Sequence, residues 1–222
     1  MYYIDLLFVK GGPIGILIWV LSTVSLGIMV RSFLRIRREE LFPGDVREEV
    51  KSLFGEGKYR RAIRSVSGND DFFSTLLQNT FSRRESGRRG MEKVLLDTAE
   101  HQTSELMRSI EWLSVIGNVA PMLGLLGTVW GMIGAFFQIV DSGSPDPRLL
   151  AGDIGVALVT TMLGLVVAIP SLCVYAAMRN RVEEITGDAV MSVDELIAEA
   201  EGGERPGPET PNQERIVAQA KS

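Results

Sequence analysis

The sequence predicts an all-α integral membrane protein with three transmembrane helices and long helices that extend into the cytoplasm. Three stretches of the 222 residues contain no Asp, Glu, Lys, Arg or His: 11–30, 113–140 and 154–178. Each stretch reaches the ~20 apolar residues that a helix needs to cross a bilayer. Basic residues gather at particular ends of these stretches, so the net charge of −5 says little by itself.

The first apolar stretch is expected to be a retained membrane helix. A secretory signal begins with a basic region and ends at a cleavage site between small residues. Residues 1–11 contain Asp5, the first nine lack any basic residue, and Arg31 follows the apolar run directly. We therefore expect residues 1–11 to form an outer N-terminus and residues 12–30 to form transmembrane helix 1.

The flanking charges predict the orientation, because cytoplasmic loops carry an excess of Lys and Arg. Only Lys10 and Arg148 lie on the opposite side. The N-terminus is therefore predicted outside and the C-terminus in the cytoplasm. The flanking cations that set this direction are Arg31, Arg35, Arg37, Arg38, Arg108, Arg179 and Arg181.

Between the first two spans, residues 31–112 are predicted to form a cytoplasmic helical domain. Gly55, Gly57 and Gly68 interrupt its helical pattern. Met91–Trp112 contains no Gly or Pro, and its apolar residues recur at helical spacing. This helix is expected to continue into transmembrane helix 2, residues 113–140. Within that span Pro121 is a candidate kink, because proline removes a helix hydrogen bond.

The remainder of the chain is expected to contain four further segments. Residues 141–153 are a short outer hairpin, and residues 154–178 are transmembrane helix 3. Residues 179–201 are a cytoplasmic helix with one apolar side. Residues 202–222, rich in Gly, Pro and Glu, are a disordered tail.

Small residues form a row along each of the last two spans. Gly124, Gly127 and Gly131 recur at steps of three and four in the second span, and Gly164 lies in a similar row in the third. Such rows let helix backbones approach closely in lipid, so simple helix association is one interpretation. The hydroxyls of Thr128 and Thr161 lie in these rows, with Thr160 next to Thr161 in the sequence, which makes a narrow polar path the alternative.

Two segments resemble a known family. Residues 120–136, APMLGLLGTVWGMIGAF, resemble the second-span signature of the MotA/TolQ/ExbB proton-channel family, and residues 157–170, ALVTTMLGLVVAIP, resemble its third-span signature. Both occur in the family's order and are separated by a short hairpin. Three spans resemble the ExbB/TolQ branch, since the MotA branch has four.

The resemblance implies a homopentamer in the bacterial inner membrane. It implies a channel built around a dimer of an ExbD/TolR-like single-span partner, whose helix carries a membrane aspartate. Thr128 and Thr161 match the family's pore-facing threonines, with Thr160 beside them. Pro121 and the glycines Gly124, Gly127, Gly131 and Gly164 correspond to tight-packing positions.

The third span departs from the family pattern at one position. Many ExbB and TolQ proteins have a glutamate where this sequence has Val156. Asp153, three residues earlier, is a candidate substitute at the outer edge. The departure leaves open a divergent branch that serves another envelope task.

The spans contain no group that can store a proton, so a partner must supply the carboxylate. We expect the channel and stator subunit of a rotary motor, driven by ion motive force, that powers import, envelope maintenance or motility. A sodium-driven member of the family and a passive oligomeric scaffold are the alternatives. No cofactor or nucleic-acid partner is expected. With one Cys and one His, and no phosphate-binding loop or paired nucleophile and base, the sequence favours neither a metal centre nor an enzyme.

Overall fold

The computed structural model describes residues 12–142 and 147–202. Within these ranges the chain forms helices and no strand, so the predicted all-α class is confirmed. The expected outer N-terminus (1–11), the tail from residue 203 and the centre of the outer hairpin (143–146) lie outside the described residues. The helices are α2 (Gly12–Arg35), α3 (Arg38–Leu41), α4 (Gly44–Gly55), α5 (Tyr59–Ser65), α6 (Phe72–Ser82), a 3₁₀ turn η1 (Arg84–Ser86), α7 (Gly87–Ser142) and α8 (Pro147–Gly202).

Three helices are long and apolar enough to cross a membrane, as predicted. The segments that meet this criterion are Pro13–Arg35, Arg84–Phe137 and Ile154–Glu201. The second and third are much longer than a bilayer requires. With 56 residues each, α7 and α8 extend about 84 Å at 1.5 Å per residue, against a hydrocarbon core of ~30 Å.

Both long helices are continuous, and each joins a span to a charged extension. The expected helix over residues 91–112 does continue into the second span, because α7 runs unbroken through Pro121. Likewise, α8 passes through Pro170 and joins the third span to the helix after it. The residues predicted to form the apolar side of that later segment are all buried: Val182, Ile185, Ala189, Val193 and Leu196.

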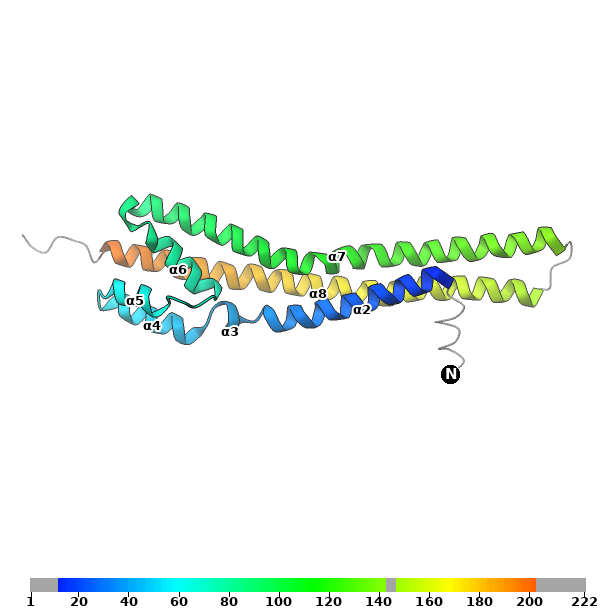
Figure 1. Ribbon diagram of the computed structural model, residues 1–222, viewed down its shortest axis with the longest axis horizontal. Coiled ribbons are helices and arrows are strands. Elements are labelled where there is room, and N and C mark those ends of the chain that lie inside the picture. Colours follow the sequence, from blue (N-terminus) through cyan, green and yellow to red (C-terminus); the bar gives the residue numbers. More distant parts are fainter. Residues whose placement is uncertain (1–11, 143–146, 203–222) are drawn as a thin grey trace, which may run out of the picture. The chain divides into compact units, whose positions relative to one another are not determined.

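The chain divides into two compact units, and α7 and α8 contribute to both. The first unit combines the chain up to Arg37 with Thr103–Glu184. Its core lies where α2, α7 and α8 meet, as Figure 1 shows for α2 along α8. The buried residues of this core are Ile18, Ile116, Ala120, Val167 and Ala168.

Elsewhere the three spanning segments keep large apolar side chains exposed, among them Leu26, Trp130 and Val166. In a membrane such side chains meet lipid or another helix at no hydrophobic cost.

The second unit combines Arg38–Gln102 with the chain from Ile185 onward. Its core is aromatic: the rings of Phe42 and Phe73 lie 5.3 Å apart edge to face, and the Phe54 ring lies 5.2 Å from that of Phe81. Gly57 and Gly68 have φ of 72° and 99°, so they supply the left-handed turns that end α4 and follow α5.

Candidate functional site

The centre of the first unit is a close contact between α7 and α8, built from small residues. A Cβ atom added to Gly164 would lie 2.5 Å from the carbonyl oxygen of Ala120, and one added to Gly124 would lie 2.8 Å from the Cα of Thr161. These neighbours are backbone atoms that cannot move aside. The two helices therefore touch backbone to backbone at this level, which only glycine allows.

The same contact extends one turn in each direction. A Cβ on Gly127 would lie 2.8 Å from the Cβ of Thr160, and a Cβ on Gly117 would lie 2.6 Å from the Cγ of Leu172. We call these four levels the α7–α8 contact: Gly117, Ala120, Gly124 and Gly127 on α7 against Thr160, Thr161, Gly164, Ala168 and Leu172 on α8.

Two hydroxyls of α8 reach the carbonyl oxygen of Gly124 on α7. Thr161 Oγ1 donates to it at 3.0 Å. Thr160 Oγ1 donates to the carbonyl of Ala157 in its own helix at 2.7 Å and lies 3.4 Å from the Gly124 oxygen. Thr160 is buried and Thr161 half-buried. The protons of both hydroxyls are thus engaged, and their oxygen lone pairs remain to accept a further bond.

The other predicted site residues lie along α7. Thr128 is half-buried and donates to the carbonyl of Leu125 at 2.7 Å, a bond within its own helix. Pro121 and Gly131 are also half-buried. Of the predicted packing glycines, Gly124, Gly127 and Gly164 lie in the α7–α8 contact of a single chain.

A buried pair of serines links α2 to α8, and the sequence analysis did not identify it. Ser25 Oγ lies 2.7 Å from Ser171 Oγ. Because Ser171 donates its one proton to the carbonyl of Val167 at 2.6 Å, Ser25 is the donor between the two serines. A signal was available: Ile18, Ser25 and Ser32 follow one another at steps of seven, and all three are buried.

A polar groove opens in the first unit beyond the uncharged part of the spans. Within it, Arg179 Nε donates to Glu183 at 3.0 Å, and this bond raises the pKa of Arg179. Charges of both signs line this open groove, whereas the α7–α8 contact has none. It is lined by Thr103, Ser104, Met107, Arg108, Glu111, Tyr175, Arg179 and Glu183.

The contact can offer lone pairs, but it has no acid or base of its own. Residues 113–140 and 154–178 contain no titratable carboxyl, amine or imidazole. Val156 is half-buried on α8. Asp153 belongs to α8, and its side chain lies outside the described residues. Among the described residues, no group of three or more His, Cys, Asp or Glu side chains could hold a metal ion.

Comparison with known proteins identifies the family of this chain. The profile of the MotA/TolQ/ExbB proton channel family matches residues 64–191. The chain is 28% identical over 203 residues to the biopolymer transport protein ExbB of Neisseria gonorrhoeae, a match that covers 83% of this chain and 91% of that protein.

Two shorter matches agree with the same branch of the family. The chain is 36% identical over 85 residues to ExbB of Xanthomonas campestris pv. campestris strain B100, covering 38% of this chain and 34% of that protein. It is 29% identical over 124 residues to the Tol-Pal system protein TolQ of Haemophilus influenzae, covering 56% of this chain and 54% of that protein. With its three apolar helices, this chain is a multi-pass inner-membrane protein that belongs to the MotA/TolQ/ExbB proton channel family, in the ExbB/TolQ branch.

Proposed function

We propose that this chain is the channel and stator subunit of a rotary motor driven by ion motive force. Five copies surround a dimer of an ExbD/TolR-like single-span protein, with their N-termini outside and C-termini in the cytoplasm. The motor energises an envelope process such as biopolymer import or Tol-Pal-type maintenance. The single observation that carries the proposal is the α7–α8 contact, which places hydroxyl lone pairs inside spans that have no titratable group of their own.

The missing acid defines what the partner contributes. A charge within the hydrocarbon is costly, and an ionisable residue there usually faces a protein interior. An aspartate on a partner helix is ionised while it faces water and neutral once it takes up a proton. The neutral form avoids the penalty of placing a charge against the apolar walls of α7 and α8. Protonation thus permits the partner helix to turn from one subunit to the next.

The hydroxyl geometry suits the protonated form of that acid. Thr161 and Thr128 each donate to a backbone carbonyl, so their oxygens are left as acceptors. An acceptor binds the O–H of a protonated carboxyl group and repels a carboxylate. Thr160 is buried beside Thr161, and its hydroxyl oxygen lies 3.4 Å from the same Gly124 carbonyl oxygen. We therefore assign the threonines to the step at which the protonated acid passes.

The energy that each ion supplies limits the barrier against which the partner helix can turn. One charge that crosses 100 mV supplies ~2.3 kcal/mol, so every turning step must have a small barrier. Outside the α7–α8 contact, the half-buried Gly131 and the exposed Gly134 of α7 carry no side chain that could obstruct such a step. The groove around Arg108 and Glu183 is the water-accessible region in which a released proton reaches the cytoplasm.

Sodium is the second candidate ion. The lone pairs of a hydroxyl oxygen can coordinate a hard cation or accept a hydrogen bond from a protonated acid, so the threonines favour neither ion. A passive scaffold that only organises partners is the remaining alternative. It would still show the close α7–α8 contact, but it would do no work that depends on an ion gradient.

The first experiment measures the composition of the complex. The full chain is purified with its bound partners from its own membranes, and native mass is measured in mild detergent. We expect five copies together with two copies of a single-span protein that has a mid-span aspartate. A stable monomer or dimer of this chain would contradict the ring.

The second experiment identifies the ion. The envelope process is measured in cells that make both subunits, once with a protonophore and once in sodium-free buffer. Loss of output only with the protonophore supports a proton motor, and loss only without sodium supports the sodium alternative. Output that survives the collapse of both gradients supports a passive scaffold.

A further inference from the structure

The second unit has a basic face on α5. Arg60, Arg61 and Arg64 are exposed, and none forms an ion pair with a described residue. The sequence from Gly57 to Asn69 contains no acidic residue. Glu56, just before it, forms an ion pair with Lys58, and Arg61 only adds to the lowering of the Glu56 pKa, so the arginines are weakly compensated. Exposed guanidinium groups in such a cluster repel one another unless a carboxylate lies close. We call these three arginines the basic face.

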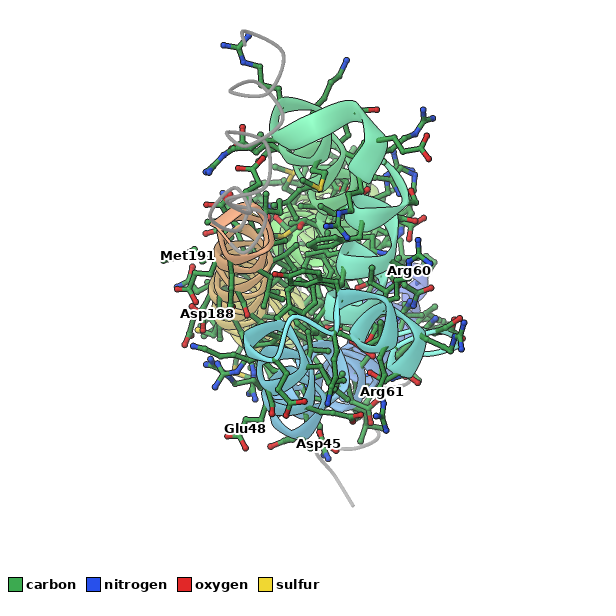
Figure 2. The ribbon with its side chains drawn as sticks, turned by 90° about the vertical axis from the view of Figure 1, so that its left-hand side faces the viewer. Asp45, Glu48, Arg60, Arg61, Asp188 and Met191 are labelled. Carbon is green, nitrogen blue, oxygen red and sulfur yellow. The ribbon has the colours of Figure 1, made fainter. Side chains whose placement is uncertain are left out.

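A second face of the same unit is acidic. Asp188, Met191 and Glu195 follow one another at steps of three and four, so they lie on one side of α8. From Ile185 to Gly202 this helix has five carboxylates and no cation: Asp188, Asp194, Glu195, Glu199 and Glu201. Figure 2 shows Glu48 of α4 on the same side of the unit as Asp188 and Met191. We call Glu48, Asp188, Met191 and Glu195 the acidic face.

Cations of its own chain compensate this acidic face only in part. Asp188 is held by Arg38 in an ion pair. The guanidinium group of Arg47 lies 5.3 Å above the ring of Phe42. Glu48 and Glu195 are exposed and form no ion pair with a described residue. Between the carboxylates, Met191 is 66% exposed.

The two faces lie on different sides of the unit. Figure 2 shows Arg60 and Arg61 on one side, Asp188 and Met191 on the other, and Asp45 between them at the lower edge. One chain therefore cannot pair its own two faces. A ring built head to tail requires that arrangement, because each subunit contacts its two neighbours through two different surfaces that fit each other.

We propose that the basic face of one copy packs on the acidic face of the next copy around the ring. The inference rests on the proposed ring and names the residues that give it order. Arginine forks bind the carboxylates of Glu48 and Glu195, and Met191 is the apolar centre that the neighbour covers. Exposed ion pairs contribute little stability each, so the contact fixes register and partner choice while the spans supply most of the association.

The test reverses the charge of each face separately and then reverses both together, which restores opposite charges across the contact. In the full chain with its partner, Arg60→Glu/Arg61→Glu and Glu48→Lys/Glu195→Lys are made separately and then combined. Native mass at low salt is expected to show a weakened ring for each double variant, with dissociation raised roughly tenfold at each contact, and a restored ring for the combination. For the unaltered chain, dissociation is expected to increase with salt.

A control with the same change in charge reverses two exposed cations of α7 that lie one helical turn apart, Arg89→Glu/Lys93→Glu, and is expected to leave the ring intact. Rings that tolerate both test reversals, or that the combination fails to restore, would overturn the inference. A chain that ends at Gly202 tests whether the tail covers the basic face instead. If this chain loses as much of the ring in native mass measurement as Arg60→Glu/Arg61→Glu does, the tail, rather than a neighbouring copy, covers the basic face and the inference is wrong. A chain that is monomeric without any substitution would instead refute the proposed function.

Discussion

The hydroxyl of Thr161 on α8 donates a hydrogen bond of 3.0 Å to the carbonyl oxygen of Gly124 on α7, 37 positions earlier in the chain. The bond forms because Gly124 has no Cβ: one placed there would lie 2.8 Å from the Cα of Thr161. A packing residue and a polar residue are thus parts of one arrangement. The two interpretations of these spans, helix association and a polar path, are therefore compatible.

Replacement of Thr161 by valine is expected to abolish ion-driven work while the chain still inserts and assembles. Valine keeps the shape of threonine but removes both the donor to Gly124 and the acceptor oxygen. Thr161→Ser keeps the hydroxyl and is expected to retain most of the work. The measurement is the output of the envelope process at matched expression of both subunits. Normal output from the valine variant would count against a role in the ion path.

Gly164→Ala is expected to destabilise the first unit by about 1–3 kcal/mol, the usual cost of overpacking. The added methyl group would lie 2.5 Å from the carbonyl oxygen of Ala120, so α7 and α8 must separate. Gly155→Ala is the matched control on the same helix, because nothing lies within 4 Å of its Cβ. Thermal unfolding in detergent compares the two variants. Equal stability of both would contradict the close contact.

The Ser25–Ser171 pair predicts which of two alanine substitutions destabilises the first unit more. Ser171→Ala removes the acceptor of the Ser25 proton and leaves a buried donor without its partner, which costs about 1–3 kcal/mol. Ser25→Ala leaves only an oxygen lone pair unused, because Ser171 still donates to Val167. Ser171→Ala is therefore expected to be the more destabilising substitution in the same unfolding measurement. The reverse order would mean that Ser171 is the donor of the pair.

The second unit offers a test that does not involve the membrane. Asp71 caps α6 by accepting from the backbone N–H of Ser74 at 2.8 Å. Asp71→Ala is expected to lower the free energy of unfolding by about 1 kcal/mol, the usual value of an N-cap. Asp70→Ala removes the same charge one residue earlier without touching the cap, so it should change little. Chemical denaturation followed by circular dichroism compares them.

The sequence by itself determined the class of the protein and its membrane segments. Three uncharged stretches of at least 20 residues favour membrane helices, because within a single segment only a helix satisfies all its backbone hydrogen bonds in lipid. The same local reasoning located the rows that contain Gly124, Thr161 and Gly164. It also found the apolar side of α8 beyond the third span, since a buried helix face follows from spacing alone.

The tertiary structure alone decided which atoms of these rows meet. The step of Gly124 and Gly127 is the same whether a row faces lipid, a neighbouring subunit or its own chain, so spacing could not predict that Gly124 receives the Thr161 hydroxyl. Ser25 was missed for the same physical reason, because a serine in a span bonds its own helix or another with similar ease. The partner of a hydroxyl depends on the register between helices, whose paired residues here lie 37 and 146 positions apart in the chain, and only the packed chain fixes that register.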